Sequence, residues 1–289
     1  MRVYEFEKFN LSCGYEKGYI TLYLIYIKLI FWIRFSLKFK DEVIVQPFTS
    51  KVSRIVMNNY PSYVKISESS EPLKPVRVTV IKDEEGRSIF KGMDRNVLRL
   101  KPQINYFFDL TSLDINLFEE IVSNPYFNTK VYSAEASVEV GETKVFEEVE
   151  IEDSKAYKIE FKTPTLIQPP RPNFKRKKNR YLLFPFSPYF LVSIQRHWNK
   201  YQEKKIIISY SRALYYFKEV DYNLKPVTVI YDKSKVRGFV GWTLFTLEAR
   251  RNSSLREGIR KLLAYSNYIG VGKSRAIGFG EVMVKGVKK

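Results

Sequence analysis

A glycine-rich segment near the end of the chain has the composition of a phosphate-binding loop. Its four glycines are Gly270, Gly272, Gly278 and Gly280. Glycine lets a backbone approach a ligand closely and turn its amides toward an anion. Lys273 and Arg275 lie between these glycines and would supply positive charge, and Ser274 completes the predicted RNA-binding set. The segment predicts phosphate or nucleic-acid binding, and the alternative is a glycine-rich turn into a tightly packed strand.

Two common nucleotide-binding motifs do not match this segment. Gly272, Lys273 and Ser274 read like the end of a P-loop, but the first P-loop glycine would fall at Asn267. Too little chain follows for a nucleotide-binding domain of that kind. The dinucleotide pattern also fails, because Arg275 occupies the position of its third glycine. Both motifs are therefore excluded.

The positive charge of the chain is concentrated in its second half. The 289 residues carry a formal charge of +18, yet residues 1–153 hold 20 basic and 23 acidic side chains. The remaining 136 residues hold 29 basic and 8 acidic side chains, which predicts contact with a polyanion. The densest basic run consists of Lys175, Arg176, Lys177, Lys178 and Arg180. We expect this run to bind RNA, and a solvated loop is the alternative.

The scarcity of cysteine and histidine excludes several kinds of site. Cys13 is the single cysteine, so the chain has neither an intramolecular disulfide nor a thiolate metal cage. His197 is the single histidine, which removes zinc sites and paired-histidine acid-base chemistry. No tight Asp/Glu group suggests a two-metal nuclease. We expect no metal, no cofactor and a reducing, cytoplasmic location.

The longest apolar stretch is too short to span a membrane. Residues 20–33 are fourteen mostly apolar residues interrupted by Lys28, whereas a spanning helix needs about 20 residues. Glu5 and Glu7 near the start, with no cleavage site after them, argue against a signal peptide. We therefore expect a soluble protein that is not secreted and has no membrane partner.

Hydrophobic periodicity in the first half indicates alternating strands and helices. Residues 29–40 alternate as a strand, and Thr49 or Ser50 can begin a helix whose Val52, Ile55 and Val56 recur at helical spacing. Asp114 is a helix cap. The remaining predicted elements are strands at 76–82, 98–110 and 130–140 and a helix at 115–122, with a hairpin around Gly141 as an alternative for the last strand.

The second half repeats the same order. Ser187 and Pro188 begin a helix that continues to about Tyr201, and Ser254 with Glu257 forms a capping box for the next helix. The predicted strands are 156–161, 226–231, 239–247 and 277–284. Two β-α-β-β-α-β units in tandem indicate an α+β protein with two ferredoxin-like domains. We expect domains at 29–153 and 154–289, preceded by an extension at 1–28 for which an upstream start codon is one explanation.

On these features the chain resembles the CRISPR-associated endoribonucleases of the sixth Cas family, which belong to the RAMP superfamily. Their C-terminal loop has the pattern G-x-G-x-x-x-x-x-G-x-G, which Gly270, Gly272, Gly278 and Gly280 match. The resemblance extends to residues 163–166 (TPTL) and 237–242 (RGFVGW) and to the tandem order of elements. It is strongest with archaeal, Sulfolobus-like members.

The resemblance implies metal-independent cleavage of precursor CRISPR RNA within its repeats. In this reaction a ribose 2′-OH attacks the adjacent phosphate and leaves a 2′,3′-cyclic phosphate and a 5′-OH. It also implies a retained guide RNA, CRISPR effector subunits as partners, and a monomer or homodimer. One alternative is a non-catalytic RNA-binding RAMP subunit of an effector complex. Another is a general single-strand RNA-binding protein, but the sequence lacks the RRM signature.

The chain departs from the family pattern at its usual catalytic residue. Many members carry a histidine on or near the first helix of the first unit, where residues 49–56 here read TSKVSRIV. His197 belongs instead to the first helix of the second unit. We interpret His197 as a packed or surface histidine, with stacking on RNA as the alternative.

We therefore hypothesise that lysine and arginine replace the missing histidine. Lys51 and Arg54 are three residues apart and lie on one helix face. A nearby arginine and partial desolvation would lower the pKa of Lys51 and let it transfer protons. Arg54 and Arg237 would stabilise the phosphorane charge, while Lys273 and Arg275 hold neighbouring phosphates. The alternative is that Lys51 and Arg54 lie on an ordinary solvent-exposed helix face. If they are catalytic, we expect slow turnover of the RNA.

Aromatic residues are abundant, with 21 Tyr and 21 Phe. Most are expected in the cores, because large rings fill the interiors of small sheets. Some could stack on unpaired bases beside the basic groove. The candidates in the second half are Tyr181, Phe184, Phe186, Tyr189, Trp198, Tyr210, Tyr215 and Tyr216.

Overall fold

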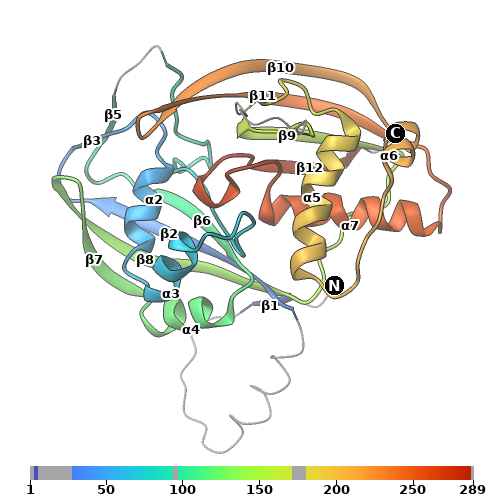
Figure 1. Ribbon diagram of the computed structural model, residues 1–289. Helices are drawn as coiled ribbons and strands as arrows, with labels where there is room; N and C mark the ends of the chain where they lie inside the picture. Colours follow the sequence, from blue (N-terminus) through green and yellow to red (C-terminus); the bar gives the residue numbers. More distant parts are fainter. Residues whose placement is uncertain (1–2, 6–27, 94–96, 171–179, 288–289) are drawn as a thin grey trace, which may run out of the picture.

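The computed structural model describes residues 3–5, 28–93, 97–170 and 180–287 (Figure 1). Cys13 and the basic residues Lys175, Arg176, Lys177 and Lys178 therefore lie outside the described residues.

The first sheet is antiparallel and has the strand order of a ferredoxin-like fold. Its four principal strands lie in the order β8-β2-β6-β4. They are β2 (Ile30–Phe39), β4 (Val76–Val78), β6 (Tyr106–Ser112) and β8 (Ala134–Phe146). Two further strands, β1 (Val3–Glu5) and β7 (Tyr126–Val131), pair with β8. The strands β3 (Val43–Val45) and β5 (Leu98–Leu100) form a separate pair.

The second sheet has the same topology. Its order is β10-β11-β9-β12, with every neighbouring pair antiparallel. The strands are β9 (Ala156–Thr165), β10 (Phe217–Tyr231), β11 (Ser234–Leu247) and β12 (Val282–Val287). Both sheets place their first and third strands at the centre, which confirms the predicted tandem of ferredoxin-like folds.

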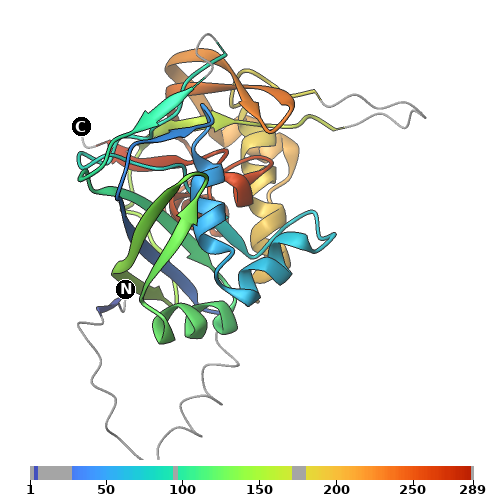
Figure 2. The same ribbon diagram turned by 90° about the vertical axis from the view of Figure 1, so that its left-hand side faces the viewer.

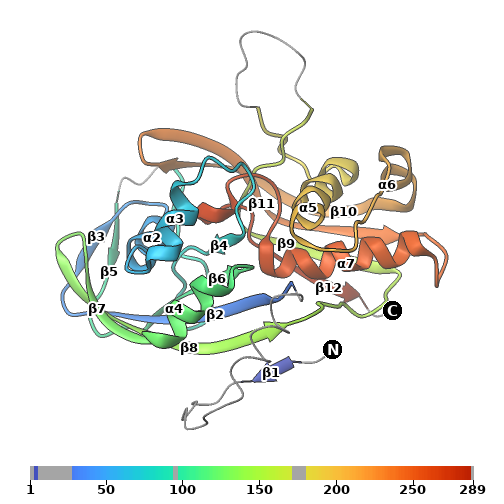
Figure 3. The same ribbon diagram turned by 60° about the horizontal axis from the view of Figure 1, so that its bottom comes forward.

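The helices were predicted in large part. The first unit has α2 (Ser50–Met57), α3 (Pro61–Glu68) and α4 (Ile115–Ser123), and the second has α5 (Ser187–Tyr201), α6 (Tyr210–Tyr216) and α7 (Ser254–Ile269). Figure 3 shows α5 and α7 side by side against the second sheet. As predicted, Asp114 caps α4, because its carboxylate accepts a hydrogen bond from the Leu117 amide. The short helices α3 and α6 were not predicted.

Three predicted boundaries are wrong for local reasons. The strand expected at 98–110 divides into β5 and β6, because Gln103 has a φ of 65° and breaks the extended backbone. The strand expected at 130–140 is a hairpin whose turn lies at Tyr132, not at Gly141. The strand expected from residue 277 begins at Val282, because η1 (Arg275–Ile277) is a turn of 3-10 helix.

The N-termini of two helices also differ from the prediction, one in its capping residue and the other in the hydrogen bond that the capping side chain makes. Ser253, not Ser254, caps α7, since its hydroxyl accepts from the Arg256 amide. Thr49 occupies the N-cap position of α2, but its hydroxyl donates to the Ile89 carbonyl oxygen instead of capping the helix.

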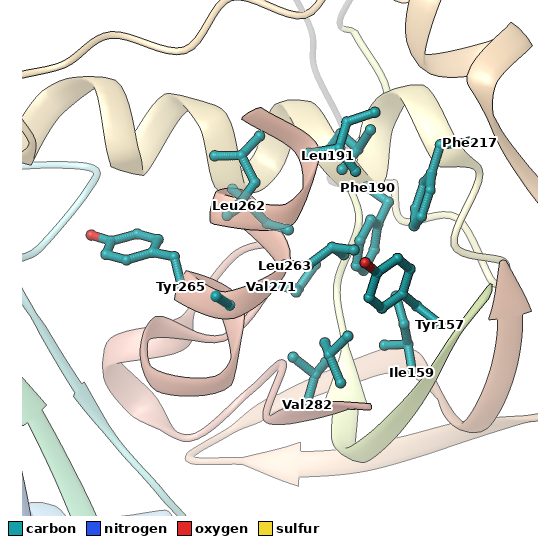
Figure 4. Packing of buried hydrophobic residues seen from close by; sticks show 14 of the residues in the cluster. Tyr157, Ile159, Phe190, Leu191, Phe217, Leu262, Leu263, Tyr265, Val271 and Val282 are labelled. Atoms are coloured by element: carbon teal, nitrogen blue, oxygen red, sulfur yellow. The ribbon is translucent and has the colours of Figure 1, made fainter. Parts of the chain in front are cut away.

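Each unit has its own hydrophobic core, and a third cluster joins them. The core of the second unit packs α5 and α7 against the sheet, with Phe190, Leu263 and Tyr157 fully buried (Figure 4). The joining cluster contains Phe48 from the first unit and Phe279 from the second, whose rings stack with centroids 4.4 Å apart. These contacts hold the two sheets in one arrangement.

Candidate functional site

The four glycines of the C-terminal segment are required by close backbone packing. All four have φ between 69° and 89°, a region that L side chains rarely adopt. A Cβ at Gly280 would lie 1.9 Å from the Val271 carbonyl oxygen, and one at Gly278 would lie 2.5 Å from Ser50 Cβ. Figure 2 shows the segment between α2 and α5. Gly278 therefore allows the two units to pack closely, and Gly280 allows the segment to pack closely on itself.

Most amides of this segment are already used within the protein, which corrects the predicted phosphate cradle. The amides of Val271 and Lys273 donate to the carbonyl oxygens of Gly280 and Leu166. Those of Gly272 and Gly280 donate to Ser193 Oγ and the Pro164 carbonyl oxygen. Because these amides are hydrogen-bonded within the protein, they do not form a cradle for a phosphate. The segment fits the alternative better, which is a glycine-rich turn into a tightly packed strand. The side chains of Lys273 and Ser274 are exposed and remain predicted RNA contacts.

The prediction that Arg275 holds a phosphate is wrong in this structure. Arg275 is 6% exposed, and its Nη1 donates to the Gly270 carbonyl oxygen at 3.4 Å. Burial lowers the pKa of Arg275 to about 10. A side chain enclosed in this way stabilises the loop from inside and does not reach a ligand in solvent.

Lys51 and Arg54 lie together where α2 meets the tip of the β10–β11 hairpin. The helix buries Val52, Val56 and Met57 in the core, which leaves its other face toward the hairpin. Lys51 Nζ lies 2.6 Å from Asp232 Oδ1, and Arg54 Nη1 donates to the hydroxyl of Tyr231. Residues 181 apart in sequence thus form one cluster of two cations, a carboxylate and a phenol.

Two more tyrosines border this cluster. Tyr63 on α3 is 1% exposed, and burial raises its pKa to about 12 although Arg54 opposes the change. Tyr132 lies at the β7–β8 turn with a φ of 54°, and burial raises its pKa while Lys51 opposes. Asp232 has a similar φ of 53° at the β10–β11 turn. Backbone strain of this kind is often found at functional sites.

The pKa of Lys51 is shifted in the opposite direction from the one expected from the sequence. Its hydrogen bond to Asp232 raises the pKa of Lys51 above its ordinary value, and the charge of Asp232 adds to this. The ammonium is therefore retained at neutral pH, so Lys51 cannot serve as a general base there. It can donate a proton or stabilise negative charge.

Arg237 lies on the opposite face of the hairpin from this cluster, which corrects its predicted place in the site. Val236 pairs with Val229 across the two strands, and both pack with Tyr231 against Phe48. Successive side chains of a strand point to opposite faces. Arg237 is exposed on the other face, so it does not act together with Lys51 and Arg54. Arg180, the described member of the basic run, is also exposed.

Comparison with known proteins identifies the family. The model described as "Cas6 N-terminal domain" matches residues 31–146, and the model "CRISPR-associated endoribonuclease Cas6" matches residues 159–282. The chain belongs to the Cas6 family.

Curated relatives are similar over nearly the whole chain, and solved structures share its fold. CRISPR-associated endoribonuclease Cas6 1 of Saccharolobus solfataricus is 27% identical, covering 90% of this chain and 98% of its own. Cas6 2 of the same organism is 25% identical, covering 89% and 96%. A Thermus thermophilus Cas6 structure has a TM-score of 0.60 at 14% identity, covering 89% of this chain and 98% of that one. A Cas6-related protein from Pyrococcus furiosus has a TM-score of 0.58, also at 14% identity, covering 88% and 98%.

The single histidine of this Cas6 family member is a packed residue, as interpreted from the sequence. His197 is 2% exposed. Its Nδ1 lies 2.8 Å from the Tyr265 hydroxyl, and its Nε2 lies 2.9 Å from the Lys74 carbonyl oxygen. Burial lowers the pKa of His197 well below its ordinary value. His197 therefore stays neutral and is separate from the Lys51 cluster.

This burial predicts a specific loss of stability in mild acid. The unfolded chain binds a proton at His197 below about pH 6.5, whereas the folded chain does not. The contribution of His197 is therefore fully present above pH 6.5 and falls by up to about 1.4 kcal/mol per pH unit below it. Urea denaturation at pH 7.5, 6.0 and 5.0 measures this slope. His197→Gln should be less stable at pH 7.5 but show a shallower slope, and an equal slope would contradict the assignment.

In the part of the chain that the structure describes, the Cas6 fold shows no group of three His, Cys, Asp or Glu side chains arranged to hold a metal. None of the described helices has the length and apolar character to cross a bilayer.

Sequence reasoning missed Tyr231 and Asp232 as members of this cluster. They occupy the turn between two predicted strands, and a tight turn of polar residues is ordinary in any hairpin. The sequence gives no local sign that this turn contacts α2, so only the folded chain identifies these residues.

Proposed function

We propose that this Cas6 family member is a metal-independent endoribonuclease that cleaves precursor CRISPR RNA within its repeats. The observation that carries the proposal is the convergence of Lys51 and Arg54 with the hairpin residues Tyr231 and Asp232, in a chain of this family. The excess of basic residues after residue 153 supports binding of an RNA polyanion. Domains at 29–153 and 154–289 would then each contribute one side of the active site.

The proposed chemistry is transesterification within the RNA. The 2′-oxygen attacks the adjacent phosphorus, the P–O5′ bond breaks, and a 2′,3′-cyclic phosphate and a 5′-OH result. Arg54 stabilises the additional negative charge of the phosphorane. Lys51, held as an ammonium, donates its proton to the departing O5′, and water or hydroxide takes the proton of the 2′-OH. Without an imidazole tuned near neutrality, turnover is slow, which is compatible with retention of the product as a guide RNA.

A cleavage assay tests this proposal directly. The protein is incubated in excess with a repeat RNA in EDTA, and a second RNA carries a 2′-deoxy residue at the scissile position. Cutting that survives EDTA and fails with the deoxy RNA is the expected result. Loss of cutting in EDTA would contradict metal independence, and cutting of the deoxy RNA would contradict 2′-OH attack.

The pH dependence of cleavage follows from the state of Lys51. Because Asp232 raises the pKa of Lys51 above its ordinary value, the ammonium persists beyond pH 10. Proton removal from the 2′-OH by hydroxide then makes the rate rise about tenfold per pH unit between pH 6 and 9. Single-turnover rates, corrected for RNA hydrolysis without protein, measure this profile. A plateau beginning between pH 6 and 8 would indicate a base of near-neutral pKa and contradict the mechanism.

A second candidate function is a non-catalytic RNA-binding subunit of a CRISPR effector complex. It is favoured by the ion pair between Lys51 and Asp232, because the ammonium group of Lys51 is already bound to a carboxylate of the protein. Stable binding of repeat RNA without cutting in the same assay would support this candidate.

A further inference from the structure

An aromatic surface lies at the far end of the β10–β11 hairpin from the Lys51 cluster. We define this α6 surface by six large side chains, each at least 42% exposed. They are Ile207, Tyr210, Leu214, Tyr215, Val220 and Tyr222. Two of them, Leu214 and Tyr215, line a hollow of about 540 Å³ together with Arg212 and Lys218. Large apolar side chains gathered in this way usually mark a binding surface.

The rings of this surface are supported from below and remain open above. Tyr222 is 58% exposed and its ring meets Phe184 edge-on, with centroids 5.1 Å apart. Tyr215 is 65% exposed and packs edge-on against Tyr216, with centroids 4.9 Å apart. Rings held at their edges keep a face free for stacking.

The charges around the α6 surface favour a polyanion. Arg212 is exposed beside Tyr215 and has no ion pair among the described residues. Lys225 is also exposed and without an ion pair there, but it lies on the opposite face of β10 from Tyr222, the face that carries Tyr231. Lys218 lies 5.5 Å from the centroid of the Tyr215 ring and also pairs with Glu248. The net charge of +18 opposes association of two copies of the chain through this face. Exposed tyrosines combined with unpaired cations are the usual means of binding unpaired nucleotides.

The β10 strand connects the α6 surface to the Lys51 cluster. It runs without interruption from Phe217 beside α6 to Tyr231 at the hairpin tip, along the edge of the second sheet (Figure 1). Nine residues separate Tyr222 from Tyr231, which corresponds to about 30 Å. This odd spacing places the two side chains on opposite faces of β10, so an RNA strand that contacts both passes over this edge of the sheet. A stacked RNA strand covers that distance with about nine nucleotides at roughly 3.4 Å each.

We infer that the α6 surface binds a single-stranded RNA segment that continues from the scissile site along β10. Lys225 contacts its phosphates on the face of β10 that carries Tyr231, and Arg212 contacts them at the α6 surface, where Tyr215 and Tyr222 stack on the bases. This inference rests on the proposed function for the position of the scissile site. It predicts a length threshold, because an RNA that ends fewer than about nine nucleotides beyond the scissile site does not reach the tyrosines.

Binding of extended and unextended repeat RNAs tests the inference. Each RNA carries a 2′-deoxy residue at the scissile position, and on one side of that position, either 5′ or 3′, the repeat is replaced by a single nucleotide, four uridines or twelve uridines. Fluorescence anisotropy at one fixed salt concentration measures Kd. We expect twelve uridines at one end to tighten binding about tenfold or more, and four uridines to have little effect. Tyr215→Ala with Tyr222→Ala should abolish this gain, and the double Phe variant should retain it.

Tyr126→Ala is the matched control, because Tyr126 is 59% exposed on β7 in the first unit. It should retain the full gain from the extension. Equal binding of all extended and unextended RNAs by the wild type would overturn the inference. If the double Ala variant keeps the full gain in RNA affinity but no longer forms a dimer that the wild type forms in sedimentation, the surface binds a second copy of the chain instead. Wild-type cleavage of the complete all-ribose repeat RNA, measured in parallel, shows separately whether the proposed function holds.

Discussion

Arg54→Ala is expected to lower the single-turnover rate of repeat cleavage about 100-fold while the chain stays folded. Removing one preorganised donor to a developing oxyanion typically costs a factor of 10² to 10³. Arg54 is the permanently charged member of the cluster, and its Nη1 is oriented by the Tyr231 hydroxyl. Rates measured with protein in excess over RNA, in EDTA, report the chemical step without product release.

Three variants make this result interpretable. Arg54→Lys keeps the charge but loses the planar fork, so we expect partial recovery. Lys51→Ala removes the proposed proton donor and should lower the rate by at least tenfold. Arg237→Ala should reduce the rate no more than about threefold through weaker RNA binding, because Arg237 lies on the other hairpin face. Rates of Arg54→Ala and Lys51→Ala within about threefold of wild type would exclude this cluster as the active site.

Glu281→Gln is expected to destabilise the protein by about 3–5 kcal/mol, because it leaves buried cations without their carboxylate partner. Glu281 is 7% exposed and lies just before β12 in the second unit. Its Oε1 is 2.7 Å from Lys82 Nζ and 3.3 Å from Arg77 Nη2, both in the first unit. Burial alone would lower the pKa of Lys82, but Glu281 and Asp109 raise it above its ordinary value. The ammonium therefore depends on both carboxylates.

This ion network also connects to the glycine-rich segment. Arg77 Nη1 donates to the carbonyl oxygens of Asn267 and Tyr268 in the last turn of α7, directly before Gly270. Such bonds satisfy carbonyls that a helix end leaves unpaired. Loss of Glu281 therefore removes a buried ion pair and also weakens the contact between the two units.

Thermal unfolding measures the effect of Glu281→Gln. A loss of 3–5 kcal/mol corresponds to a decrease in Tm of roughly 10 °C for a chain of this size. Glu42→Gln is the matched control, because Glu42 pairs with Arg99 at 2.6 Å with side chains 42% and 64% exposed. An exposed pair contributes at most about 1 kcal/mol. A Tm of Glu281→Gln that equals that of the control would show that the buried network does not stabilise the joint.

Local patterns were sufficient for most of the fold. Alternation in residues 29–40 and the polar cap Asp114 describe features that neighbouring residues enforce on one another. The order of such elements, repeated twice, is enough to indicate tandem ferredoxin-like units. The short helix α6 escaped prediction because its seven residues are too few to show a period. The turn at Tyr132 escaped because it contains neither glycine nor proline.

The sequence by itself determined the family, the tandem fold and the absence of a histidine from the first helix, because glycine spacing and residue types are properties of the chain alone. Only the tertiary structure decided which charged groups meet. Lys51 pairs with a carboxylate 181 positions away, Arg275 is enclosed by the loop that carries it, and Arg237 points away from the site. Side-chain spacing fixes which face a residue occupies, but the packing of one element against another fixes what that face contacts. The pKa of Lys51 and the reach of each arginine follow from that packing.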